Sequence, residues 1–124
     1  MTLAEFLAAR IEEDEAAARG AGGEYWYTAV VPGESMRKSP DEPTHTIIDS
    51  PKSLITYEVC TDEMAEHIVR HDPERVLAEC EAKRRIVRRH TLCDDTSFGE
   101  PCEDLRDLAV PYRDHPDYRQ EWKP

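Results

Sequence analysis

The fold predicted for this chain is decided by residues 67–90, which read HIVRHDPERVLAECEAKRRIVRRH. The pair Asp72-Pro73 in the middle ends one helix, because the residue before a proline is pushed out of the helical region. The same pair can start the next helix, with Asp72 as the N-cap, Pro73 in the first helical position and Glu74 in the first turn. We therefore predict two consecutive helices, broken at Asp72-Pro73.

Both helices have apolar side chains at the three- and four-residue spacing of a buried face. Thr61 or Asp62 is suited to cap the first helix, and the second ends near His90. The side chains expected to face inward are Met64, Ala65, Ile68 and Val69 in the first helix, and Val76, Leu77, Cys80 and Val87 in the second, with Ile86 at the margin.

The N-terminal residues predict one long helix. Thr2 and Glu5 have the spacing of a capping box, in which each side chain accepts a hydrogen bond from the backbone of the other residue. The helix is expected to reach Arg19, with Gly20 just beyond its end and residues 20–23 forming a flexible joint. Its apolar face consists of Leu3, Phe6, Leu7 and Ile11.

Three short strands are predicted at residues 25–31, 44–49 and 53–59, which are rich in aromatic and β-branched side chains. The proline-containing residues 32–43 are expected to form a loop, and residues 50–52 a turn. The strands predict a three-stranded antiparallel meander that a helix covers on one face. Trp26 is expected in the core.

The C-terminal part begins with a predicted loop at residues 91–100. Pro101 can open a last helix, and the aromatic tail is expected to fold back onto the body. The apolar face of this helix consists of Cys102, Leu105, Leu108, Ala109 and Tyr112. The sequence as a whole predicts an α+β fold in a single domain spanning residues 1–124.

The composition limits the classes of partner. The 124 residues include 27 acidic and 16 basic side chains, for a net charge of −11, which argues against general affinity for nucleic acid or anionic membranes. No signal peptide and no apolar run near the ~20 residues of a membrane-spanning helix is visible. We expect a cytoplasmic protein whose four cysteines stay reduced unless they bind metal.

His90, Cys93 and Cys102 form the first candidate site, a structural zinc site. Thiolates and imidazoles are the usual ligands of zinc, and a short spacing such as H-x2-C lets a turn wrap around the ion. Cys80 or His71 can supply the fourth ligand. The competing interpretation is that these cysteines are ordinary buried thiols.

His67, His71 and Asp72 form a second candidate, a catalytic metal site. The two histidines are four residues apart and share one face of a helix. Ile68 stands where a metalloprotease of the HExxH type has its glutamate, so a general base is missing. Asp72 is, in addition, the predicted N-cap.

Positive charge is concentrated near the end of the second helix of the 67–90 stretch. One interpretation is that these side chains complement the helix dipole and pair with neighbouring acids. The alternative is a binding patch for a phosphate group, a nucleic acid or an acidic partner. The residues are Lys83, Arg84, Arg85, Arg88 and Arg89.

Two longer strings, at residues 67–84 and 108–122, are specific enough to suggest a family. The second reads LAVPYRDHPDYRQEW, and residues 4–7 and 13–15 also fit. They resemble an uncharacterised family of small proteins from actinobacteria and their phages. The resemblance implies a compact α+β domain in a bacterial or phage cytoplasm. Its members often have extra cysteines before Pro101-Cys102, where this chain has only Cys93.

These observations favour a non-enzymatic accessory or regulatory protein that acts through contacts with a protein partner and is associated with a phage or mobile element. One alternative is a small zinc-stabilised binding module. The other is a metal-dependent enzyme that uses His67, His71 and Asp72.

Overall fold

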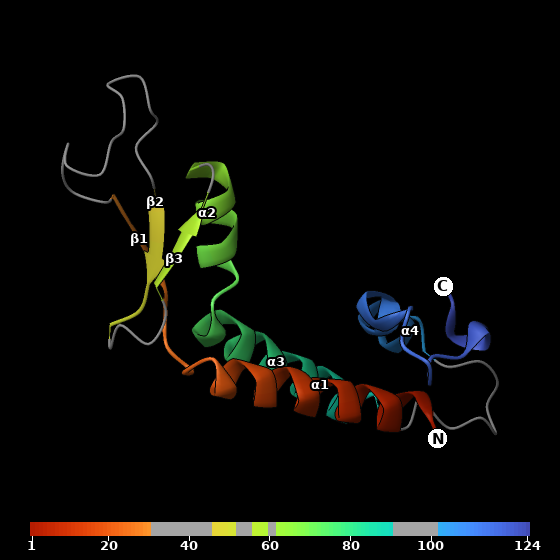
Figure 1. Cartoon of the computed structure of the whole chain (residues 1–124). Helices are drawn as coiled ribbons and strands as arrows, with labels where there is room; N and C mark the ends of the chain where they lie inside the picture. The colour runs from red at the N-terminus through yellow and green to blue at the C-terminus, as the bar shows by residue number, and fades with distance from the viewer. Residues whose placement is uncertain (31–45, 52–55, 60–61, 91–101) are drawn as a thin grey trace. The chain divides into compact units, whose positions relative to one another are not determined.

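The computed structural model describes residues 1–30, 46–51, 56–59, 62–90 and 102–124, and it is helix-rich with a small antiparallel sheet (Figure 1). The predicted α+β class is confirmed. The elements are α1 (Leu3–Gly20), β1 (Tyr27–Val30), β2 (Thr46–Asp49), β3 (Thr56–Val59), α2 (Asp62–Arg70), α3 (Pro73–Arg89), α4 (Glu103–Ala109) and the short 3-10 helices η4 (Val110–Tyr112) and η5 (Gln120–Trp122).

Residue contacts divide the chain into two compact units. The first consists of Met1–Ala17 and Leu77–Pro124, and the second of Ala18–Val76. The predicted loops at 32–43 and 91–100, together with Thr61, Pro101 and residues 31, 44–45 and 53–55 of the predicted strands, lie outside the described residues. Tyr25 and Trp26 are described, and the prediction that they belong to the first strand was wrong, because β1 begins at Tyr27.

The first turn of α1 is closed by the predicted capping box. The N–H of Thr2 donates to Oε2 of Glu5 at 2.8 Å, and the N–H of Glu5 donates to Oγ1 of Thr2 at 3.1 Å. Two of the donors that a helix N-terminus leaves without a partner are thereby satisfied. This prediction is confirmed at both hydrogen bonds.

The end of α1 differs from the prediction. Gly20 is the last helical residue, and Gly22 takes the left-handed conformation with φ 105°. The N–H of Gly23 donates to the carbonyl of Ala18 and that of Gly22 to Arg19, both at 3.0 Å, which is the Schellman pattern. The prediction that Gly20 lies just beyond the helix was wrong, because the left-handed residue that ends the helix is Gly22.

The first unit is built around Phe6. Its ring lies within 6.4 Å, between centroids, of the rings of Tyr112, His115, Tyr118 and Trp122. The C-terminal tail therefore folds back as predicted, and this unit's buried residues include Leu3, Leu7, Ile11, Cys80, Val87, Leu105, Ala109 and Trp122.

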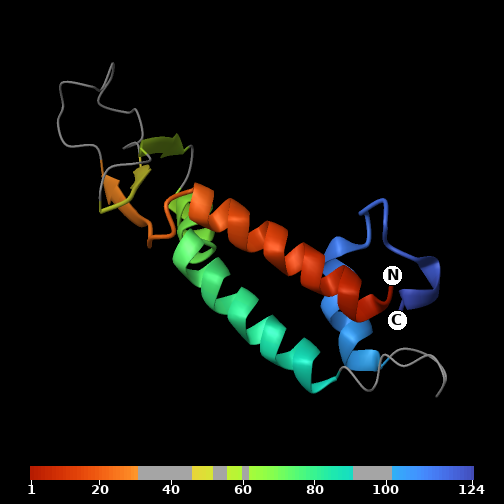
Figure 2. The ribbon, with the colours of Figure 1, turned by 90° about the horizontal axis from the view of Figure 1, so that it is seen from below.

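Helices α1 and α3 lie side by side within the first unit. Figures 1 and 2 agree in showing the later turns of α3 alongside α1. Nη2 of Arg84 lies 2.7 Å from Oε2 of Glu15, which is 9% exposed. This ion pair joins the two helices, and the largely buried carboxylate makes it stronger than an ordinary surface pair.

The second unit contains the sheet, in which β1 pairs with β2 and β2 with β3, all antiparallel. Ile48 of β2 and Ala65 of α2 form a buried cluster, against which Trp26, Ile68 and Val69 pack. The predicted inward orientation is wrong for Met64, which is 50% exposed. Helix α2 has only nine residues, so the face that packs on the core is narrow. It consists of Ala65, Ile68 and Val69, and Met64 lies at its edge.

Asp72 closes the first turn of α3 as its N-cap. Its Oδ1 accepts the N–H of Arg75 at 2.8 Å, and its Oδ2 accepts the N–H of Trp26 at 3.1 Å. The predicted break and cap at Asp72-Pro73 are thus confirmed. The same carboxylate also fixes the backbone just before β1.

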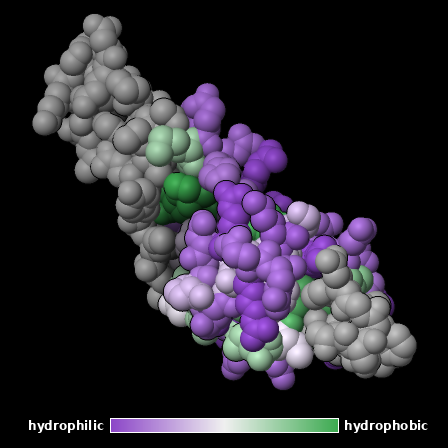
Figure 3. Space-filling model, turned by 90° about the vertical axis from the view of Figure 1, so that its right-hand side faces the viewer, coloured by the Kyte–Doolittle hydropathy of each residue, from purple (hydrophilic) through white to green (hydrophobic). Residues whose placement is uncertain are grey.

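The surface of the described residues is largely polar. Figure 3 shows hydrophilic side chains over most of the coloured part of one face, as expected for a chain with a net charge of −11. None of the helices in the described residues has the length and apolar character needed to cross a membrane.

Candidate metal site

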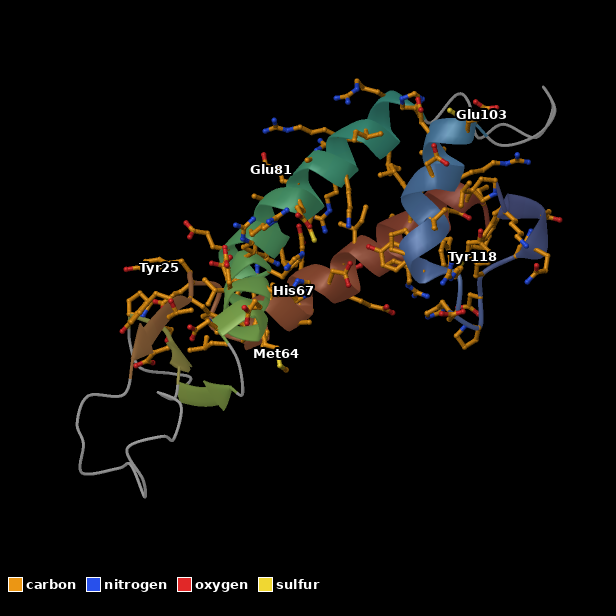
Figure 4. The ribbon with its side chains drawn as sticks, turned by 90° about the horizontal axis from the view of Figure 1, so that it is seen from above. Tyr25, Met64, His67, Glu81, Glu103 and Tyr118 are labelled. Atoms are coloured by element: carbon orange, nitrogen blue, oxygen red, sulfur yellow. The ribbon has the colours of Figure 1, made fainter. Side chains whose placement is uncertain are left out.

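His90 and Cys102 come together from the ends of two helices in the first unit. His90 directly follows α3, and its N–H donates to the carbonyls of Ile86 and Val87 at 3.2 and 3.1 Å. Cys102 directly precedes α4, and Figure 4 labels the neighbouring Glu103 at the start of that helix. Sγ of Cys102 lies 3.4 Å from Nδ1 of His90.

Cys102 occupies the N-cap position of α4 without acting as a cap. Its backbone is extended, with φ −54° and ψ 137°, and its side chain forms no hydrogen bond to the helix backbone. A serine, threonine, aspartate or asparagine would normally perform that role. The thiol is thereby left to face His90.

Asp104 completes the group from the first turn of α4. Its Oδ2 lies 3.4 Å from Nε2 of His90, whose side chain is 24% exposed. One possible ligand atom from each of Cys102, His90 and Asp104 lies within 4.8 Å of the others. Among the described residues, this is the group in which three such side chains meet.

The separation of the sulfur and the nitrogen suits a shared zinc ion. Zinc binds sulfur at about 2.3 Å and imidazole nitrogen at about 2.0–2.1 Å, so two such ligands at a tetrahedral angle lie about 3.5 Å apart. The 3.4 Å between Cys102 and His90 agrees with this value. The same distance also fits a hydrogen bond between the thiol and the imidazole, so it is compatible with a shared zinc ion and with a metal-free pair.

The group borders an open cavity of about 410 Å³. One basic side chain, Arg89, and two acidic ones, Asp104 and Asp107, line this cavity. The excess of negative charge favours a divalent cation there. Its lining residues are Ile86, Arg89, His90, Asp104, Asp107 and Leu108.

Cys80 is not part of the group. It precedes His90 by ten residues in the sequence, which at 1.5 Å per residue corresponds to about 15 Å along the helix. Its side chain is 1% exposed, and burial, followed by the charge of Asp14, raises the pKa of the thiol above its ordinary value. The predicted role of Cys80 as the fourth zinc ligand is not supported, because a buried, protonated thiol is a poor ligand.

The two other predicted ligands are not brought to the group. Cys93 lies outside the described residues, so its role stays a prediction. His71 belongs to the second unit, where its Nδ1 lies 2.8 Å from the carbonyl of His67 and the two rings are 4.6 Å apart.

The second candidate site gains no support from the geometry. Both carboxylate oxygens of Asp72 accept backbone N–H groups, and His71 is engaged by the backbone of His67. These three side chains do not meet as a group of ligand atoms. Asp72 is therefore a structural residue in this fold.

The predicted binding patch is largely engaged within the first unit. Arg84 pairs with Glu15, Arg85 pairs with Glu81 at 2.5 Å, and Nζ of Lys83 lies 5.7 Å above the ring of Tyr112. The predicted pairing of this patch with neighbouring acids is confirmed for both arginines. Its exposed end consists of Arg88 and Arg89.

Asp104 was missed by the sequence interpretation. It is one of 27 acidic residues, and only the start of α4 at Glu103 turns it towards His90. A weak signal was nevertheless present, since Asp104 follows a predicted ligand, Cys102, by two residues.

Comparison with known proteins places the chain in a family. No curated protein and no solved structure matches it. Residues 1–124 match a family described as a family of unknown function, DUF6221. Because this match covers the whole of the sequence, the chain belongs to that family.

Proposed function

We propose that this protein is a small zinc-stabilised binding module, which acts through contacts with a protein partner and is not an enzyme. The observation that supports it best is the 3.4 Å separation between Sγ of Cys102 and Nδ1 of His90. These two side chains belong to different helices, so an ion between them would join the end of α3 to the start of α4.

A structural role for the ion follows from the size of α4. This helix has seven residues, and isolated helices shorter than about 12–15 residues are marginal in water. Structural zinc contributes its binding free energy to folding. A zinc ion at Cys102 and His90 would therefore stabilise the docking of α4 within the first unit, with Cys93 as a further ligand predicted from the sequence.

The proposed setting is bacterial or phage-associated and cytoplasmic, and it is supported by the family resemblance of residues 67–84 and 108–122. The net charge of −11 favours a protein partner over nucleic acid. In this proposal the partner contacts the exposed end of α3 at Arg88 and Arg89.

The zinc site is tested by metal analysis of the full chain. Protein reconstituted with zinc at neutral pH and then freed of loosely bound metal is expected to retain one equivalent. His90→Gln and Cys102→Ser are expected to lose most of it. The thermal unfolding temperature should fall when a chelator removes zinc from the unaltered chain, but not in these two variants.

Matched controls are available in the same chain. Cys80→Ala removes the buried thiol and His71→Gln removes a histidine from the second unit, and both should retain the zinc. The proposal is abandoned if the unaltered chain retains no zinc, or if the double variant His90→Gln/Cys102→Ser retains a full equivalent.

The same geometry supports a second candidate function of a different class, a thiol-dependent enzyme. Cys102, His90 and Asp104 stand in the order of a nucleophile, a base and a carboxylate that orients the base. Alkylation of the metal-free protein by iodoacetamide, followed by peptide mass spectrometry, distinguishes the candidates. The enzyme is excluded if the alkylation rate of Cys102 is no higher than that of a small free thiol and does not change in His90→Gln.

A further inference from the structure

We propose that residues 110–124 of the first unit form a binding site for a small organic oxyanion, a compact apolar molecule that carries a carboxylate or a phosphate group. Arg113 and Lys123 bind the oxyanion. The apolar part of the molecule packs against Val110, Tyr118 and Pro124. These residues are not those of the candidate metal site, and the proposal does not depend on zinc.

The site is a cavity of about 370 Å³, lined by side chains from both ends of this C-terminal segment. Small-molecule sites in proteins generally have volumes of about 300–1,000 Å³ and combine apolar surface with a few polar groups. The cavity lies at the lower end of this range. Its size therefore suits a small organic molecule better than an inorganic ion.

The polar side chains that line the cavity have no partner in the described part of the chain. Through their polar groups they form neither a hydrogen bond nor an ion pair there. In the same segment, by contrast, Arg119 pairs with Glu121 at 3.4 Å. The polar groups of the cavity are thus available to a ligand. They belong to Arg113, Asp114, Tyr118, Gln120 and Lys123.

The charges of the lining favour an anion. Arg113 and Lys123 contribute two positive charges against the one negative charge of Asp114, in a chain whose net charge is −11. The cavity at His90 has the opposite excess of charge. A guanidinium group binds a carboxylate or a phosphate through two parallel N–H donors, and an ammonium group adds a point charge. The two basic side chains together therefore match an oxyanion.

The segment that carries the cavity is held in place before any ligand binds. The N–H groups of Arg113, Tyr118 and Lys123 each donate to the carbonyl three residues earlier, at 3.2, 2.9 and 3.1 Å. The ring of Tyr118, which Figure 4 labels, has edge contacts with Phe6 and Trp122 at centroid distances of 6.0 and 5.9 Å. An ordered lining loses less conformational entropy on binding, and this favours affinity.

The test is an NMR titration of the full chain at low ionic strength, with phenyl phosphate, benzoate and inorganic phosphate as probes. We expect at least one of the two aromatic probes to bind saturably at millimolar concentration or below, with amide shifts at residues 110–124. Inorganic phosphate should bind more weakly, because it has no apolar part. The comparison of phenyl phosphate with benzoate identifies the preferred oxyanion.

Four variants at exposed positions test the assigned charges, and their spectra check that the fold persists. Arg113→Gln and Lys123→Gln should each weaken binding about tenfold, because each removes a hydrogen bond between charged groups. Asp114→Asn should strengthen binding, because it removes a negative charge from the lining. Arg119→Gln is the matched control. It removes a positive charge from the same segment, but Arg119 does not line the cavity, so the affinity should stay unchanged.

Several results would overturn the proposal. They are the absence of saturable binding by both aromatic probes, equally tight binding of inorganic phosphate, and an Arg119→Gln variant that weakens binding as much as Arg113→Gln. Amide shifts at Arg88 and Arg89 in place of residues 110–124 would assign the anion to the exposed end of α3 and overturn it as well. None of these results affects the proposed zinc module.

Discussion

Tyr112 shows how the fold alters the ionisation of a single residue. Its hydroxyl donates to Oδ2 of Asp14 at 2.6 Å. Burial raises the pKa of the phenol most, and the hydrogen bond and charge of Asp14 raise it further above its ordinary value of 10.0. The folded state therefore favours the protonated phenol.

We expect this shift to make the protein lose stability at alkaline pH. In the unfolded chain Tyr112 loses its proton near pH 10, whereas the folded chain retains it to higher pH. The unfolded state then binds fewer protons, so the free energy of unfolding falls as the pH rises above about 10. Urea unfolding of the unaltered chain and of Tyr112→Phe between pH 8 and 11 measures the effect.

The variant should be less stable at pH 8 by about 1.5–3 kcal/mol, because it lacks a hydrogen bond to a charged group. Its stability should also fall less steeply above pH 10. Tyr25→Phe, at a 50% exposed position, serves as the control and should behave like the unaltered chain. An equal alkaline slope in Tyr112→Phe would show that another group is responsible.

The sequence predicted part of the candidate site at the level of residues. The proximity of His90 and Cys102 followed from their chemistry and from the helix ends on which they lie. Asp104 could not be distinguished among 27 acidic residues, because its role depends on the exact start of α4. The prediction of Cys80 as a possible fourth ligand did not take into account the rise of the helix that separates it from His90.

At the level of elements, Asp72 links α3 to the segment before β1. Asp72→Ala removes the N-cap of α3 and leaves the N–H of Trp26 without its partner. A lost cap costs about 1 kcal/mol, and the partly buried N–H of Trp26 costs about 1–3 kcal/mol more when it loses its partner. We therefore expect the variant to lose roughly 2–4 kcal/mol, as measured by urea unfolding at pH 7.

Two further variants make this measurement specific. Asp72→Asn keeps one acceptor oxygen and should fall between Asp72→Ala and the unaltered chain. Glu74→Gln changes an exposed charge in the same turn and should cost only a few tenths of a kcal/mol. If Asp72→Ala costs no more than Glu74→Gln, the carboxylate does not hold α3 in the assigned way.

The elements were predicted with unequal success, for physical reasons. The helices have local signals, such as the box at Thr2 and Glu5 and the break at Asp72-Pro73, and these signals are satisfied by nearby backbone groups. The exposure of Met64 was not predictable in this way. It depends on how much of α2 the sheet covers, which is a tertiary property.

At the level of the whole molecule, the contacts divide into two units, each with a core of its own. The sequence predicted a single domain. Ile11 in the first unit and Ile48 in the second are each 1% exposed. They provide a matched pair of positions, because Ile→Val removes one methylene group at either site.

We expect each Ile→Val variant to loosen mainly its own unit. The substitution typically costs 0.5–1.5 kcal/mol, and 1 kcal/mol changes the population of an open state about fivefold. Hydrogen exchange followed by mass spectrometry should show faster exchange at residues 1–17 and 77–124 in Ile11→Val. In Ile48→Val the increase should fall on residues 18–76, because subglobal opening follows cooperative units.

The contrast between the two variants is the informative quantity, since each serves as the control for the other. If the two units open separately, the same Ile→Val change accelerates hydrogen exchange in the first unit for Ile11→Val and in the second unit for Ile48→Val. If both variants accelerate exchange equally in both units, the protected amides exchange through one global opening, and the chain behaves as the single cooperative domain that the sequence predicted. In that case a zinc ion bound at the proposed site of His90 and Cys102 would stabilise the whole chain, whereas two separate openings would confine its effect to the unit that contains α4.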